Sequence, residues 1–211
     1  MAVISKIPGL SVSVAVNNEI ATEYSTVESE ISGSIDGEAS AAGDRGEHVW
    51  PRTTTYIESY SGAPFRIEAT FSAGFQTAVS KHKDHDAISV EVYVDGTWVT
   101  SGWAYLESLG KDAPYVIPIE NTWTQSETGG LLEERQFAFA PVSRVDDASK
   151  QKIVEDSKIA ESLGEIIIGI DLMTTVDDDF FDYPENVANP AGVFSLAEKA
   201  MKGAAISHGT S

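Results

Sequence analysis

Apolar residues recur at every second position over much of the first two thirds of the chain, and this spacing limits the fold more than any other feature. Val12, Val14 and Val16 alternate with small polar residues, and the same alternation continues over residues 65–71 and 88–94. Successive side chains of a strand point to opposite faces of a sheet, so each run has one face suited to a core. The pattern predicts an all-β, mainly antiparallel chain.

Turn residues between the apolar runs predict which strands form hairpins. Asp95-Gly96 joins residues 88–94 to residues 97–105, and Asp-Gly suits a two-residue hairpin turn. Asn17-Asn18 predicts an N-terminal hairpin over residues 10–24. Ser61-Gly62 predicts a further hairpin between residues 53–60 and 65–71.

The last third of the chain mixes strand and helix signals. Strands are predicted at 131–139 and at 166–172, where a run of isoleucines suits a central strand covered on both faces. A helix is predicted between them, with Asp146 or Asp147 as its N-cap and Gly164 at its C-terminal end. A shorter helix is expected over 195–202. The element order predicts one domain, residues 1–211, that folds as a β-sandwich with one or two peripheral helices.

The chain is strongly acidic. Its 33 Asp and Glu residues against 14 Lys and Arg give a formal net charge of -19. This charge disfavours nucleic acid and anionic membranes as partners and favours cations or basic proteins. The chain has no cysteine, so disulfides are excluded, and we find neither a secretory signal pattern nor an apolar stretch of membrane-spanning length. We expect a soluble, cytoplasmic protein.

Two acidic segments carry separate predictions. Residues 25–47 are rich in Ser, Gly, Ala and carboxylates and predict a mobile acidic loop. Residues 177–211 predict a tail that wraps the sandwich. The tail begins with a run of carboxylates that suits Ca²⁺ or Mg²⁺, although its spacing is not that of an EF-hand and a solvated charge run is the alternative. These residues are Asp177, Asp178, Asp179 and Asp182.

Motifs for catalysis are absent from the sequence. There is no Gly-rich phosphate loop, no G-x-S-x-G turn and no H-E-x-x-H pair, so we predict that the protein is not an enzyme. Residues 81–86, KHKDHD, place two imidazoles beside two carboxylates, a set that suits a transition metal if the turn brings them together. The flanking lysines favour a solvated loop instead.

Aromatic residues in the most clearly predicted hairpin form the candidate ligand site. Trp98 and Trp103, together with Tyr93 and Tyr105, suit a flat apolar ligand that stacks on the indoles and is oriented by a hydroxyl group. The alternative role of these rings is packing in a core or an interface.

Several segments resemble a fungal domain family of unknown function. They are IPGLSV (7–12), YIES (56–59), VYVDG (92–96), LG (163–164) and KGAAISH (202–208), and the resemblance spans nearly the whole chain. The family carries no agreed catalytic residues. One member is a soluble pigment protein, so the resemblance implies binding of a small aromatic chromophore without a covalent bond, within the sandwich or at the interface of a homodimer. The alternative function is an acidic interaction module that docks a basic protein through residues 25–47 and the Asp177 run.

Overall fold

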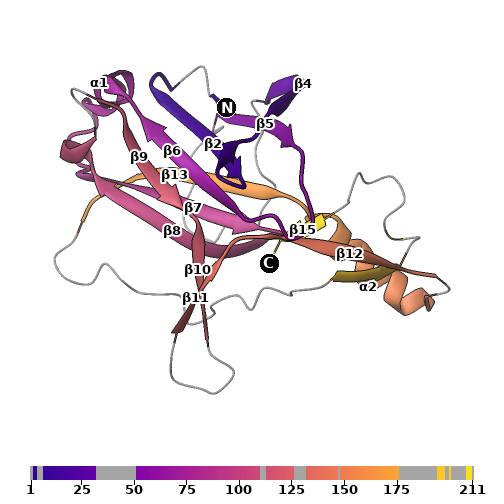
Figure 1. Cartoon of the computed structure of the whole chain (residues 1–211). Coiled ribbons are helices and arrows are strands. Elements are labelled where there is room, and N and C mark those ends of the chain that lie inside the picture. Colours follow the sequence, from indigo (N-terminus) through magenta and orange to yellow (C-terminus); the bar gives the residue numbers. More distant parts are fainter. Residues whose placement is uncertain are drawn as a thin grey trace, which may run out of the picture.

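The computed structural model of the chain describes residues 2–3, 7–31, 51–109, 113–125, 132–146, 148–175, 194–197, 200 and 208–210. Most of these residues lie in antiparallel strands, and the two α-helices lie at the periphery (Figure 1), which confirms the all-β prediction. The helical elements are α1 (Ala73–Val79), α2 (Lys150–Ala160) and the 3-10 turn η1 (Leu106–Ser108). The strands are β1 (Ala2–Val3), β2 (Leu10–Val16), β3 (Glu19–Ile20), β4 (Glu23–Ile31), β5 (Arg52–Ile57), β6 (Phe65–Phe71), β7 (Ala87–Val94), β8 (Thr97–Tyr105), β9 (Tyr115–Ile119), β10 (Asn121–Gln125), β11 (Leu132–Gln136), β12 (Phe139–Val145), β13 (Ile166–Met173), β14 (Phe194–Ala197) and β15 (His208–Thr210).

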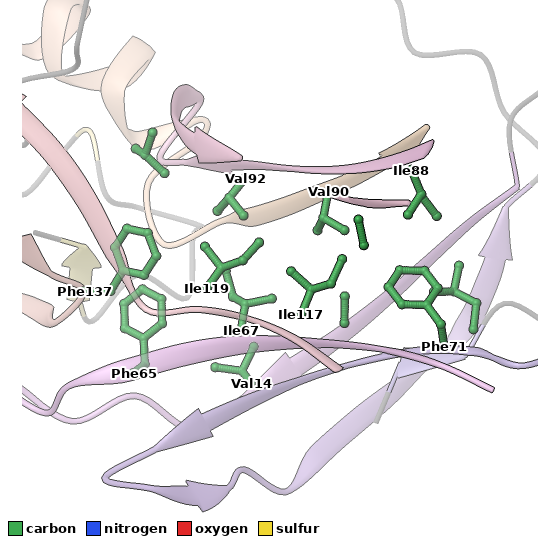
Figure 2. Close-up of a cluster of buried hydrophobic side chains, with 14 of the residues drawn as sticks. Val14, Phe65, Ile67, Phe71, Ile88, Val90, Val92, Ile117, Ile119 and Phe137 are labelled. Carbon is green, nitrogen blue, oxygen red and sulfur yellow. The ribbon is translucent and has the colours of Figure 1, made fainter. Parts of the chain in front are cut away.

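Two sheets face each other across the main core. One sheet has the order β1-β2-β6-β9, with β3 paired to the end of β2, and the other has the order β13-β7-β8. Figure 2 shows Val90 and Val92 of β7 pointing toward Ile67 of β6 and toward Ile117 and Ile119 of β9. All five side chains are buried, so the alternating runs supply the two inner faces of the sandwich.

Aromatic rings extend this core beyond the two sheets. The Phe65 ring stacks on the rings of Phe137 and Phe139, with centroid distances of 5.2 and 4.7 Å. Phe139 begins β12, which pairs in parallel with β14 and antiparallel with β15. The Phe65 contacts therefore join β6 to the part of the fold that carries the last strands.

The β7–β8 hairpin is confirmed. Asp95 and Gly96 both have positive φ angles, 51° and 76°, as a two-residue turn of the I′ type requires. The strands pair from Val94 with Thr97 to Ala87 with Tyr105. The Asp-Gly turn thus fixes the register of the sheet that carries the candidate site.

Of the other two predicted hairpins, one is confirmed in part and one does not form. The N-terminal hairpin is confirmed only as β2 with β3, because β4 pairs with β5 instead. The hairpin predicted around Ser61-Gly62 does not form, since β6 lies between β2 and β9. The reason is the segment between β5 and β6, where the Gly62 N–H donates to the Phe139 carbonyl at 2.7 Å. This contact with a distant strand replaces a local turn.

The late strand β13 is an edge strand, which corrects the prediction of a central one. Within the described residues it pairs only with β7, and Ile167 is 38% exposed. Ile166, Ile168, Ile170 and Leu172 pack on the core, so only one face of β13 is covered. An apolar run alone does not separate a central strand from an edge strand.

Helix boundaries also differ from the predictions. The N-cap of α2 is Ser149, whose hydroxyl accepts from the Lys152 N–H at 3.2 Å, and not Asp146 or Asp147. Gly164 has a φ of 81°, so the left-handed glycine after the helix is confirmed. Residues 195–197 belong to β14 and not to a helix. Helix α1 was not predicted from the sequence.

The prediction places the start of the acidic loop too early in the sequence. Residues 25–31 belong to β4, which pairs with β5 across an irregularity between Ser25 and Glu30. Residues 32–50, and most of the predicted tail from 177 onwards, lie outside the described residues.

Candidate functional site

All four aromatic residues predicted as a ligand site lie on one face of the β13-β7-β8 sheet. Because Ile88, Val90 and Val92 point inward, the residues between them on β7 point outward. Trp103 is paired with Ser89, and Trp98 with Tyr93. We call this surface the outer aromatic face and define it by four rows of strand partners. The rows are Met173-Ala87-Tyr105, Asp171-Ser89-Trp103, Gly169-Glu91-Ser101 and Ile167-Tyr93-Trp98.

A β-bulge places Trp98 on this face. The register between β7 and β8 shifts by one residue between the Val92–Thr100 and Tyr93–Trp98 pairs. Both Val99 and Thr100 are consequently buried on the inner side. Strict alternation from Trp103 would have turned Trp98 inward, so the extra residue brings the two indoles to the same surface. The buried Thr122 hydroxyl donates to the Val99 carbonyl at 2.7 Å and satisfies the bulged backbone.

The outer aromatic face has aromatic rings at both ends and a row of smaller side chains between them, which we call the low row. On one side Tyr93 lies opposite Trp98, and on the other the Trp103 and Tyr105 rings meet edge to face at 5.1 Å and 88°. The row between them, Gly169-Glu91-Ser101, has no large apolar side chain. Rows at Ser89 and Tyr93 are four residues apart along β7, about 14 Å at the usual rise of a strand. This spacing suits a flat molecule lying between the two ring-bearing rows.

A hydrogen bond joins Tyr93 to Glu91 at the edge of the low row. The Tyr93 hydroxyl donates to Glu91 Oε2 at 3.0 Å. Partial burial, together with this hydrogen bond and the nearby charges of Glu91 and Asp171, raises the pKa of the Tyr93 phenol. Tyr93 therefore stays protonated at neutral pH, and Glu91 keeps oxygen lone pairs that face the row. The face can accept a hydrogen bond from a ligand and favours a neutral or cationic one.

These rings do not belong to the buried core. Tyr93, Trp98 and Trp103 are partly buried, and Tyr105 is 44% exposed. Sequence reasoning identified the rings but missed Glu91 and Gly169. Glu91 alternates with Val90 and Val92, which is a signal of its outward position, whereas the pairing of Gly169 with Glu91 joins distant parts of the chain.

The remaining candidates are placed as follows. The rings of His82 and His85 stack with centroids 6.3 Å apart. Within the described residues, no group of three or more His, Asp or Glu side chains is arranged to hold a metal ion. Asp177, Asp178, Asp179 and Asp182 lie outside those residues, so Ca²⁺ or Mg²⁺ binding there stays a prediction. No helix in the described part of the chain is long and apolar enough to cross a membrane.

Comparison with known proteins gives one match. A family profile described as a domain of unknown function (DUF7918) matches residues 9–211. No curated protein and no solved structure matches the chain.

Proposed function

We propose that this chain, which belongs to the DUF7918 family of domains of unknown function, is a non-enzymatic pigment protein that binds a small flat chromophore on its outer aromatic face. The observation that carries the proposal is the gathering of Tyr93, Trp98, Trp103 and Tyr105 on one partly exposed sheet face. Indole and phenol rings outside the core offer large stacking surfaces, and contiguous exposed apolar groups of this kind are typical of binding sites.

The ligand lies over the Gly169-Glu91-Ser101 row, with its ring system between the Tyr93–Trp98 pair and the Trp103–Tyr105 pair. Gly169 and Ser101 leave room because their side chains are absent or small. The Glu91 carboxylate accepts a hydrogen bond from a hydroxyl or N–H group of the ligand, as it does from Tyr93. With Glu91 and Asp171 on the face, the ligand is neutral or cationic.

The chromophore is held without a covalent bond. The chain has no cysteine for a thioether. None of the residues that define the outer aromatic face is a lysine, so a Schiff base has no amine there. A second copy of the chain covering this face would exclude water from the ligand, which is the arrangement we propose for a homodimer.

Resemblance supports the same function. The segments quoted above, from IPGLSV at 7–12 to KGAAISH at 202–208, resemble the pink chromoprotein of oyster mushrooms, a soluble protein that holds a small chromophore non-covalently. We infer a fungal origin on the same basis, and we propose a cytoplasmic location because a chain without cysteine suits a reducing compartment.

The test starts with protein purified from its native source. We expect a visible absorption band, and a small molecule released on denaturation that mass spectrometry identifies. Trp98→Ala and Trp103→Ala should each weaken rebinding of that molecule about tenfold, since a ring contact contributes on the order of 1 kcal/mol beyond its buried area. Trp123→Ala is the control, because Trp123 is an exposed indole on β10 and belongs to none of the four rows that define this face.

Folded variants that lack both Trp98 and Trp103 but keep the band and the affinity would exclude this site. Native protein without colour or ligand would exclude the pigment function. Salt-sensitive capture of a basic protein by such colourless protein would favour the acidic interaction module instead, for which the net charge of -19 is the supporting observation.

A further inference from the structure

A cleft of about 460 Å³ lies between α1, residues 80–86 and η1, separate from the outer aromatic face. The cleft is open to solvent on one side, so a ligand in it would be only partly covered. Its polar lining includes Gln76, His82, Lys83, His85 and Glu107, and its apolar lining consists of Val79 and Leu106. The cleft thus combines an apolar surface with nitrogen donors.

Two turns hold the histidines on the cleft. The His82 N–H donates to the Val79 carbonyl at the end of α1, and the His85 N–H donates to the His82 carbonyl. These bonds fold the segment so that the two imidazole rings stack at 23° to one another. The Leu106 N–H donates to the Asp86 carbonyl at 2.8 Å, which fixes η1 against the same segment. The position of the rings is therefore set by backbone contacts on both sides.

Some hydrogen-bond donors in the cleft already bond to other groups of the protein, and others remain available to a ligand. The hydroxyls of Thr77 and Ser80 donate to helix carbonyls, so their protons are not available to a ligand. Within the described residues, the side chains of Gln76, His82 and Lys83 make no hydrogen bond or ion pair. The groups left to meet a ligand are an amide, an ammonium and an imidazole, all of which suit an anion.

The charge around the cleft depends on the two histidines. Residues 81–86 carry Lys81, His82, Lys83 and His85 against Asp84 and Asp86, η1 adds Glu107, and α1 has no charged residue. The Asp86 carboxylate already accepts from the Thr175 N–H and hydroxyl. With neutral imidazoles the carboxylates outnumber the lysines. With both imidazoles protonated the cations outnumber the carboxylates, which reverses the sign of the local charge.

We propose that this cleft binds small organic carboxylates that carry an apolar body, and that binding strengthens as His82 and His85 become protonated. The carboxylate meets the His82 imidazole, the Lys83 ammonium and the Gln76 amide, and the charge of His85, whose ring Nδ1 lies 3.4 Å from the Thr174 hydroxyl, acts at longer range. The apolar body lies against Val79 and Leu106. An anion stabilises the protonated form of an imidazole, so affinity rises as the pH falls.

The experiment uses benzoate as the probe and the full chain as the protein. Titrations are followed by NMR through the ring C–H signals of the histidines, at about pH 5.5 and pH 7.5. We expect saturable shifts of the His82 and His85 signals and binding about tenfold tighter at the lower pH, because a protonated imidazole attracts a carboxylate more strongly than a neutral one. Benzyl alcohol, which keeps the ring without the charge, should bind at least about tenfold more weakly.

Variants of the cleft residues test whether benzoate binds in the cleft. Lys83→Gln and the double variant His82→Gln/His85→Gln should each weaken benzoate binding at the lower pH, and the double variant should also remove the pH dependence. Lys158→Gln, on the exposed side of α2, removes the same charge as Lys83→Gln from a distant site and should leave binding unchanged. Absence of saturable shifts, equal affinity at both pH values, or equal weakening by Lys158→Gln would overturn the proposal. Inorganic phosphate binding as tightly as benzoate would overturn the requirement for an apolar body.

Discussion

Asp156 accepts a hydrogen bond from the backbone N–H of Ala197 at 2.7 Å, and this bond fastens helix α2 to strand β14. The Asp156 side chain is 6% exposed and also accepts from the Lys152 Nζ at 3.1 Å. The same ammonium donates to the Ser195 carbonyl. A buried carboxylate with two donors thus holds together elements far apart in the sequence.

Asp156→Ala should lower the free energy of unfolding by about 2 to 4 kcal/mol, because it leaves the Ala197 N–H and the Lys152 ammonium without their acceptor. Urea denaturation measures the loss. Glu155→Ala is the control, since Glu155 is exposed and its carboxylate bonds only to Gln151 within the described residues. Equal losses in the two variants would contradict the role given to Asp156.

Gly9→Ala should be far more destabilising than Gly62→Ala, although both glycines have similar φ angles of 78° and 75°. A Cβ on Gly9 would lie 2.2 Å from the backbone nitrogen of Phe75, whereas nothing lies within 4 Å of a Cβ on Gly62. Strain alone should cost about 1 kcal/mol at Gly62, and the clash with α1 should bring the cost at Gly9 to about 3 kcal/mol or more. Thermal unfolding compares the two. Similar costs would mean that α1 does not approach Gly9 so closely.

Asp86 should stabilise the fold at neutral pH and lose this effect in acid. Hydrogen bonds from the Thr175 hydroxyl and N–H hold the pKa of the Asp86 carboxyl below its ordinary value. A lowered folded-state pKa gives stability that is present above the unfolded-state pKa, about 4, and is lost as the pH falls through the folded-state value.

The stability difference between wild type and Asp86→Asn should therefore shrink between about pH 5 and pH 2, as measured by urea denaturation across that range. Asp84→Asn removes the same charge nearby, from a side chain that accepts no hydrogen bond in the described part of the chain. If both variants differ from wild type by the same pH-dependent amount, the Thr175 bonds are not the cause.

Tyr93 should lose its phenolic proton at a higher pH than an ordinary tyrosine. Its pKa is raised first by burial and then by the bond to Glu91, so Glu91→Gln should lower the pKa part of the way toward the usual value near 10. A raised folded-state pKa stabilises the fold below the unfolded-state pKa, and this effect disappears as the pH rises through the folded-state value. NMR of the tyrosine Cζ atoms measures the titration, with Glu120→Gln as the control. An unchanged Tyr93 titration in Glu91→Gln would contradict the bond.

Local patterns were sufficient to predict β2, β6, β7 and β8 and the pairing of β7 with β8, but not the partners of β6. Alternation follows directly from burial of one strand face, and Asp95-Gly96 specifies a turn by its backbone angles alone. The position of β6 depends instead on contacts such as Gly62 with Phe139, which no local pattern contains. Likewise, residues 195–197 read locally as a helix start, yet β12 and Asp156 hold them in a strand.

The sequence was sufficient to predict which aromatic residues form the candidate site, but not that they lie on one face of the sheet. Trp98 and Trp103 are five positions apart, so strict alternation places them on opposite faces. The bulge at Val99 reverses this, and a bulge leaves no clear mark in the sequence. The low row between the rings needs Gly169 beside Glu91, a pairing between strands separated by α2.

The pairing of β13 with β7 also bears on how the chain reaches its native state. The β7–β8 hairpin closes over two turn residues and can form early, while Ile166 must find Val94 across the whole of the intervening sequence. Chains rich in such distant contacts fold slowly, because loop closure costs entropy before the contacts are made. Until β13 docks, one side of β7 lacks its ladder partner and the low row lacks Gly169. A nascent chain would thus display both tryptophans before it has a place to seat a ligand between them.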